Sequence, residues 1–77
     1  MDFNSELIAE MNMLIKFSLS SEMTGLKVHS SASGEVIAAT ERLFAKGLVT
    51  AKDGGYLTNL GRDAAIKAKE VLQILTY

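Results

Sequence analysis

The chain has 77 residues, 48% hydrophobic and 22% charged, a balance typical of one globular domain rather than a disordered segment. It contains no cysteine and a single histidine, which excludes a disulfide framework and argues against a structural zinc site. The formal net charge is −1, so composition alone does not predict a nucleic-acid-binding protein.

The chain shows no sign of membrane insertion or export. No apolar run approaches the roughly 20 residues that a membrane-spanning helix needs. The first residues, MDFNSELIAEM, are acidic and lack the basic region and cleavage site of a signal peptide. We therefore expect a cytoplasmic protein that does not contact a membrane.

The first periodic segment, residues 4–16, predicts an amphipathic helix. Asn4 is the expected N-cap, and Glu6 in the first turn suits the helix dipole. The expected core-facing side chains are apolar and recur at helical spacing: Phe3, Leu7, Ile8, Met11, Leu14 and Ile15. The opposite face is expected to hold Ser5, Ala9, Asn12 and Lys16.

Residues 17–33 are rich in serine and threonine and have no clear period. Ser20 is placed to cap a short helix that ends at Gly25. Leu26, Lys27 and Val28 alternate as in a short edge strand. We expect a connector made of these two pieces.

The next predicted helix covers residues 34–46, with Ser33 as its N-cap and Gly47 as its stop. Its inner side is expected to hold Val36, Thr40, Leu43 and Gly47, flanked by Ile37, Ala39 and Phe44. Its outer side is expected to hold Glu35, Ala38, Glu41, Arg42, Ala45 and Lys46.

Residues 48–58, LVTAKDGGYLT, hold two β-prone runs around an Asp-Gly turn and predict a two-stranded hairpin. A two-residue Asp-Gly loop competes with a three-residue Lys-Asp-Gly loop. We favour the three-residue loop, because it pairs Val49 with Leu57 and Thr50 with Tyr56 and keeps apolar residues on one face.

Thr58 is expected to cap a last helix over residues 59–75. Its predicted inner stripe is Leu60, Ala64, Ala68, Val71 and Leu75, with Ile74 beside it. Its outer stripe is Arg62, Ile66, Lys69 and Gln73. The last turns are apolar on nearly every side, which is unusual for a helix on a protein surface.

No constellation of side chains predicts catalysis. His29 lies alone in a serine-rich loop, and no serine sits in a G-x-S-x-G turn. The glycines form no phosphate-binding loop of a known type. We therefore expect no enzymatic activity, no metal and no cofactor.

The order helix, connector, capped helix, hairpin, helix is that of a winged helix-turn-helix. The run RLFAKGLVTAKDGGYLTNLGRDAA, residues 42–65, resembles the recognition-helix end, wing and following helix of bacterial winged-helix regulators. Residues 43–49 and 57–62 match the Lys-Gly-Leu-Val, Leu-Thr and Gly-Arg elements of that pattern. Over nearly its whole length the chain also resembles a small family of short bacterial proteins with no assigned function, whose members are labelled DNA-binding proteins or transcriptional regulators.

This resemblance implies a mainly α fold with a small β-hairpin wing, in a single winged-helix domain over residues 1–77. It also implies a non-enzymatic transcriptional regulator that binds double-stranded DNA through the 34–46 helix and the 48–58 wing. The residues expected to meet base edges are Ser33, Glu35, Ala38, Glu41 and Arg42. Phosphate contacts are expected from Lys27, His29, Ser30, Ser31, Ser33, Lys46, Lys52 and Arg62.

A second hypothesis is a winged-helix protein–protein interaction module that does not bind DNA. The 34–46 helix carries two acidic and two basic side chains and is close to neutral, and the serines before it would serve equally well as caps. DNA binding requires the basic side chains on one side, with the glutamates turned away or paired. Interaction with a protein requires a large exposed apolar patch.

The two-fold symmetry of many DNA-binding proteins raises the question of a homodimer. A dimer would double the phosphate contacts and read a palindrome. The candidate seam is the apolar end of the last helix: Val71, Leu72, Ile74, Leu75 and Tyr77. These turns would equally suit packing against the first helix of the same chain, so both arrangements stay open.

Overall fold

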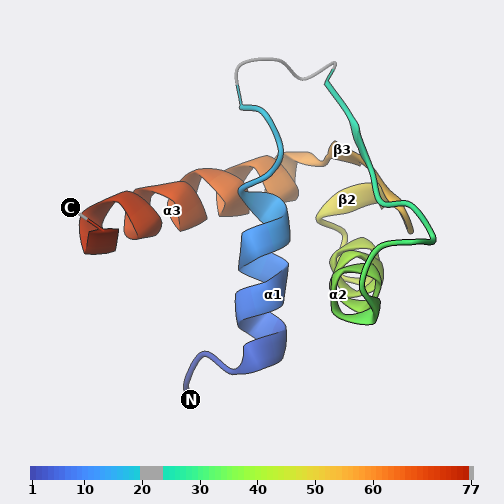
Figure 1. The fold of residues 1–77 in the computed structure, drawn as a ribbon. Helices are drawn as coiled ribbons and strands as arrows, with labels where there is room; N and C mark the ends of the chain where they lie inside the picture. Colours follow the sequence, from blue (N-terminus) through green and yellow to red (C-terminus); the bar gives the residue numbers. More distant parts are fainter. Residues whose placement is uncertain (20–23, 77) are drawn as a thin grey trace.

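The computed structural model describes residues 1–19 and 24–76, and in these residues it holds three helices and one small sheet (Figure 1). The helices are α1 (Ser5–Leu14), α2 (Gly34–Ala45) and α3 (Asn59–Thr76). The strands are β1 (Leu26–Lys27), β2 (Val49–Ala51) and β3 (Gly54–Leu57). The fold is thus mainly helical with a small antiparallel sheet. In Figure 1, α1 stands between α2 and the outer half of α3, which extends away from the rest of the molecule.

The helix ends follow the capping residues that the sequence predicts. Asn4 accepts a 2.9 Å hydrogen bond from the Leu7 amide at the start of α1, and Ser33 accepts one of 3.2 Å from the Val36 amide at the start of α2. After α2, Gly47 adopts a φ of +79°, the left-handed conformation that ends many helices. The side chains of Asn4 and Ser33 thus bind amide groups that the first turn of a helix leaves without partners.

The sheet contains a third strand beside the expected hairpin. Its strand order is β1-β3-β2 with both pairs antiparallel, so the predicted connector strand joins the far edge of β3. The predicted pairing of Val49 with Leu57 is confirmed. Ala51 lies opposite Gly54, however, so the loop has two residues and the predicted three-residue loop is wrong.

A register shift in the hairpin explains this difference. Between Val49 and Ala51 the pairing is interrupted, and Thr50 instead accepts a 2.9 Å hydrogen bond from the Tyr56 amide through its hydroxyl. Gly54 and Gly55 have φ values of +120° and +73°, which place the extra residue of a bulge on β3. The sequence signal for a glycine turn was correct, but two adjacent glycines shifted its position.

The core lies where the end of α1, the inner face of α2, β2 and the first half of α3 meet. Its buried apolar members are Met13, Leu14, Phe17, Ala39, Leu43, Val49 and Ala65. Thr40 is also buried, and its hydroxyl donates a 2.8 Å hydrogen bond to the Val36 carbonyl oxygen. The inner face predicted for α2 is thus largely confirmed.

The buried face predicted for α1 is wrong in part. Phe3 and Ile8 are 70% and 45% exposed, whereas Glu10 and Met13 are buried. The apolar side chains cover a wide arc of this helix, and α2 packs at one edge of that arc, on the side of Glu10. Periodicity located the arc, but it could not select the flank that α2 covers.

The inner stripe predicted for α3 is also wrong in part. Leu60, Val71 and Leu75 are all more than half exposed, and the buried positions are Gly61 and Ala65. Only the first half of α3 packs against the core. The helix lies so close to the core there that residues with little or no side chain occupy the contact positions.

The predicted short helix around Ser20 lies outside the described residues. Gly25, its predicted left-handed stop, has no positive φ, so that part of the prediction is wrong. Within the described part of the chain, no helix is long and apolar enough to cross a membrane.

Candidate nucleic-acid interface

The segment between β1 and α2 brings several predicted site residues together. Lys27 ends β1, and the chain then turns through residues 28–33 to the N-cap of α2. One surface hollow is lined by Lys27, Val28, His29, Ser30, Ile37, Glu41, Lys52 and Asp53. The tip of the hairpin, the end of β1 and the outer side of α2 therefore meet at one place.

A neighbouring hollow extends this surface toward α1. It shares Lys27 and His29 with the first and adds Ser31 and Lys16, the latter from just after α1. The sequence analysis predicted Lys16 on the outer face of the first helix and did not include it among the site residues. No sequence signal links it to β1, since the two come together only in the folded chain.

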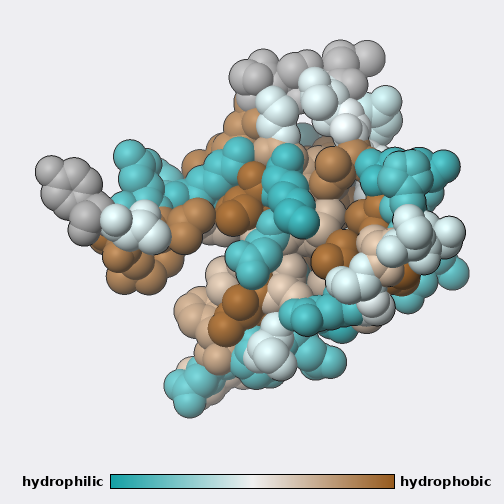
Figure 2. Space-filling view, in the orientation of Figure 1, coloured by the Kyte–Doolittle hydropathy of each residue, from teal (hydrophilic) through white to brown (hydrophobic). Residues whose placement is uncertain are grey.

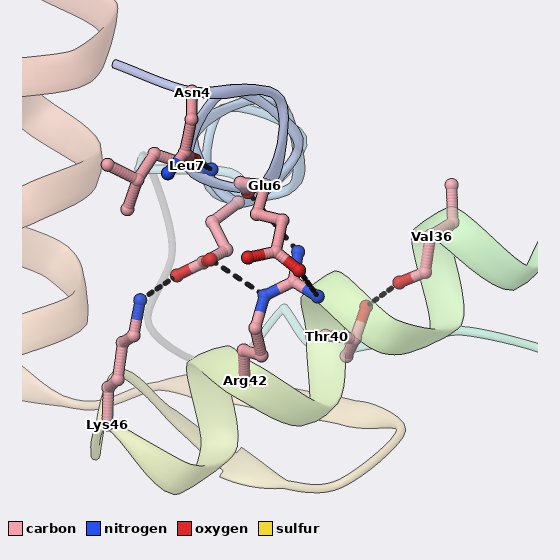
Figure 3. A network of polar contacts seen from close by, with 8 residues as sticks. Asn4, Glu6, Leu7, Val36, Thr40, Arg42 and Lys46 are labelled. Carbon is pink, nitrogen blue, oxygen red and sulfur yellow. Dashed lines mark hydrogen bonds and ion pairs between the residues drawn. The ribbon is translucent and has the colours of Figure 1, made fainter. Parts of the chain in front are cut away.

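The basic residues of α2 lie elsewhere, against a buried carboxylate of α1. Glu10 is 5% exposed, and its Oε2 atom accepts a 2.8 Å hydrogen bond from Nε of Arg42. Its Oε1 atom binds Nζ of Lys46. Arg42 also donates to the Glu6 carbonyl oxygen at 3.3 Å (Figure 3). Two cations that we expected on the outer side of α2 are thus turned toward α1.

The pKa of Glu10 reflects this arrangement. Burial favours the neutral acid and acts to raise the pKa of Glu10, but hydrogen bonds from Lys46 and Arg42 and their positive charges act in the opposite direction. The net result is a pKa below the ordinary value of a glutamate. Glu10 is therefore a paired carboxylate at neutral pH rather than a candidate general acid.

The basic residues of α3 are also occupied within the chain. Arg62 donates a 2.6 Å hydrogen bond to the Leu19 carbonyl oxygen, and Lys69 donates one of 2.9 Å to the Phe17 carbonyl oxygen. Both carbonyls follow the end of α1, so the two side chains hold that segment against α3. Arg62 was predicted to contact the DNA backbone, but its guanidinium group is engaged in this hydrogen bond within the chain.

The Leu-Thr-x-x-Gly-Arg run has a structural role at the junction of α2, β2 and α3. Thr58 accepts a 3.0 Å hydrogen bond from the Gly61 amide and donates one of 2.6 Å to the Gly47 carbonyl oxygen. A Cβ atom on Gly61 would overlap the Leu48 carbonyl oxygen, so α3 begins at a spacing that only glycine allows. This part of the winged-helix pattern is explained by capping and close packing.

Among the described residues, three lysines have no ion-pair or hydrogen-bond partner. In the part of the chain that the structure describes, every other lysine and arginine makes an ion pair or a hydrogen bond to a carbonyl group. The three are Lys16, Lys27 and Lys52, which we call the lysine surface. All three are exposed, and they border the two adjoining hollows beside the N-terminal half of α2.

The remaining predicted contacts lie around this surface. Ser33 is exposed, but its hydroxyl is engaged in capping α2. Glu35 and Glu41 are exposed, and among the described residues they have no ion-pair partner. Ala38 is half-buried. The lysine surface is therefore interspersed with acidic side chains rather than uniformly positive.

The placement of the histidine and acidic side chains bears on metal binding. Among the described residues, no group of three or more histidine or acidic side chains is placed to hold a metal ion. His29 is exposed, and the carboxylate with a shifted pKa is paired on both oxygens. Among the described residues, the lysine surface offers hydrogen-bond donors and cations to a ligand.

Comparison with known proteins places the chain in a family. The model of a family of unknown function, DUF5669, matches residues 1–76. The chain belongs to DUF5669. No curated protein and no solved structure matches it significantly. The description of DUF5669 gives no ligand, partner or reaction, so the DNA-binding role expected from the sequence stays a prediction.

Proposed function

We propose that this member of DUF5669 binds double-stranded DNA, without catalysis, as a small winged-helix protein. Support comes from the order of the elements: a capped helix, α2, is followed by the β2–β3 hairpin. Strand β3 lies at the centre of the sheet and also pairs with β1. In winged-helix proteins, that helix enters the major groove and the hairpin lies against the backbone.

The observation that carries the proposal is the distribution of free cations. Lys16, Lys27 and Lys52 come from three separate segments, the turn after α1, β1 and the hairpin tip, yet they border one surface beside the N-terminal half of α2. The affinity of proteins for DNA depends largely on such lysines, because each one that meets a phosphate releases a counterion. The hydroxyl groups of Ser30 and Ser31 lie at the same surface and add hydrogen-bond donors.

The pairing of Arg42 and Lys46 with Glu10 limits the part of α2 that is proposed to contact DNA. These two side chains hold α2 against α1, so the contact uses the beginning of α2, the segment before it and the hairpin tip. With about three phosphate contacts per copy, log Kd should change with log salt at a slope of roughly 3. Binding by a single copy would therefore be weak at physiological salt.

Fluorescence anisotropy with a labelled random duplex tests the proposal at about 50 and 200 mM salt. Lys52→Ala and Lys67→Ala remove the same charge, but Lys67 pairs with Asp63 on α3, away from the lysine surface. We expect Lys52→Ala to weaken binding and lower the salt slope by about 0.9, and Lys67→Ala to change neither. Equal effects of both variants, or no binding at 50 mM salt with tens of micromolar protein, would overturn the proposal.

A second candidate function, binding of another protein, is favoured by one specific observation. Glu35 and Glu41 are exposed on α2 without ion-pair partners in the described chain, while the basic residues of this helix are paired. Such a face suits a basic partner surface better than a phosphate backbone. If the random duplex does not bind, capture of basic peptides by the chain and by Glu41→Gln is the corresponding test.

A further inference from the structure

One stripe along α3 changes from buried to exposed. Gly61, Ala65, Ala68, Leu72 and Leu75 follow one another at alternating spacings of four and three residues, the repeat of helices that pack side by side. Gly61 and Ala65 are buried against the body, whereas Leu72 is 46% and Leu75 77% exposed. The face of α3 that packs against the core therefore continues as an apolar face along the outer half of the helix, where no other part of the described chain covers it.

The outer end of α3, residues 71–76, is apolar on its other sides as well. Val71 is 51% and Ile74 73% exposed, and residues 71–76 contain no charged side chain. Figure 2 shows hydrophobic side chains gathered along this part of the helix. Isolated exposed leucines are common on protein surfaces, but a contiguous group of this kind marks an interaction site.

A second apolar surface lies opposite, on α1. Leu7 points toward α3 in Figure 3, and Ile8 and Phe3 beside it are exposed. Figure 2 shows a hollow between α1 and the outer end of α3, with hydrophobic side chains on both walls. We call this hollow the α1–α3 notch. It contains the flank of α1 that the sequence predicted to be buried and that the chain leaves open.

The exposed area is larger than a compact monomer of this size presents. The chain exposes 5351 Å². A folded monomer of the same mass is expected to expose about 4,600 Å². Exposed apolar side chains on the outer end of α3 and on the open flank of α1 contribute to this larger area.

We propose that the α1–α3 notch receives the outer end of α3 from a second copy of this chain, forming a two-fold symmetric dimer. A two-fold interface requires that one chain carry both complementary surfaces, and here the protruding helix end and the notch are on the same chain. Residues 71–76 carry no charged side chain that would be buried without a partner.

A lipid surface fits these observations less well. Helices that lie on membranes carry Lys or Arg along their polar face, whereas the last turn of α3 has no basic residue. The proposed dimer does not depend on DNA binding, since the notch and the lysine surface use different residues. If both hold, the salt slope for one dimer on DNA is about twice that of one copy.

Sedimentation equilibrium of the full chain at about 5–200 µM tests the dimer, with Leu75→Glu and Gln73→Glu as a matched pair. Both variants add one negative charge to the same turns, but Gln73 lies away from the apolar stripe. We expect the wild type and Gln73→Glu to have twice the mass of the chain. Leu75→Glu should raise the dissociation constant roughly 100-fold, because the charge enters a two-fold interface twice.

A crosslinking experiment identifies the contact directly. The chain contains no cysteine, so Phe3→Cys in one copy and Leu75→Cys in another provide unique sites for a short bis-maleimide. The proposal expects a crosslinked pair from this mixture and none when Lys52→Cys replaces Phe3→Cys. A wild type that is monomeric at 200 µM, equal dimerisation of both charge variants, or equal crosslinking of both mixtures would overturn the proposal.

Discussion

Nε of Arg42 in α2 lies 2.8 Å from Oε2 of Glu10 in α1, and this contact joins the two helices across their interface (Figure 3). The carboxylate is nearly inaccessible, while the arginine side chain keeps 29% of its surface exposed. Lys46 binds the other oxygen of Glu10. The two ion pairs together set the position of α2 and turn both cations away from its outer side.

Loss of the Glu10 charge should destabilise the fold. In Glu10→Gln, the amide cannot accept two charge-assisted hydrogen bonds, and Arg42 and Lys46 lose their counterion. Both cations can still reach water, so we expect a loss of about 1–3 kcal/mol in the free energy of unfolding at pH 7. Urea unfolding measures it. Glu6→Gln is the control, since Glu6 is exposed and 3.8 Å from Arg42, and it should change stability by less than about 0.5 kcal/mol.

The contribution of Glu10 should depend on pH with a defined sign. Its native pKa is lowered, whereas in the unfolded chain the group titrates near the ordinary value of about 4.3. Between these two values the unfolded chain binds more protons, so the stabilisation is complete above about pH 5 and is lost as pH falls through the native pKa. The difference in stability between wild type and Glu10→Gln should shrink as the pH falls below about 5 and through the native pKa. A difference that stays constant over this range would contradict the assignment.

Gly61→Ala should disrupt the junction between β2 and α3. The added Cβ atom would overlap the Leu48 carbonyl oxygen, and the first turn of α3 would have to move away from β2. We expect a loss of about 2 kcal/mol or more in thermal or urea unfolding. Gly34→Ala is the matched control, because a Cβ atom there meets open space, and it should be neutral or stabilising by up to about 1 kcal/mol. Equal effects of both substitutions would contradict the proposed role of Gly61.

Local signals in the sequence predicted the element boundaries well. Asn4, Ser33 and Thr58 each accept the expected amide hydrogen bond, because a cap acts within four residues of itself. The long-range features could not be predicted in this way. The pairing of Glu10 with Arg42 joins residues 32 positions apart, and no local pattern encodes it.

The structure brings part of the predicted site together and leaves other predicted residues elsewhere. The sequence predicted Lys27 and His29 just before α2 and Lys52 at the tip of the hairpin, and the structure brings all three to the lining of one hollow. Lys16 was missed because it reaches this surface only when α1 packs beside β1. Glu10 was missed because the sequence analysis assigned it to neither face of the first helix. Its spacing from Met13 and Leu14 places it on the same side of the helix as these two residues.

Neutralising an acid on α2 should increase DNA affinity if this helix faces the duplex. Glu41 lines the same hollow as Lys27 and Lys52 and would repel a phosphate there. We expect Glu41→Gln to tighten binding several-fold at 50 mM salt, with a smaller effect at 200 mM. Glu70→Gln makes the same charge change on α3 and should have little effect. Affinity unchanged by Glu41→Gln would place α2 away from the DNA.

Chemical-shift mapping of the isotope-labelled chain with a short duplex tests DNA binding by the lysine surface most directly. The amides of residues 26–38 and 50–54 should shift on addition of DNA and return when salt is raised. Those of residues 42–46 and 70–76 should remain close to their free positions. Shifts confined to α3, or no shifts at low salt with the duplex in excess, would contradict the account.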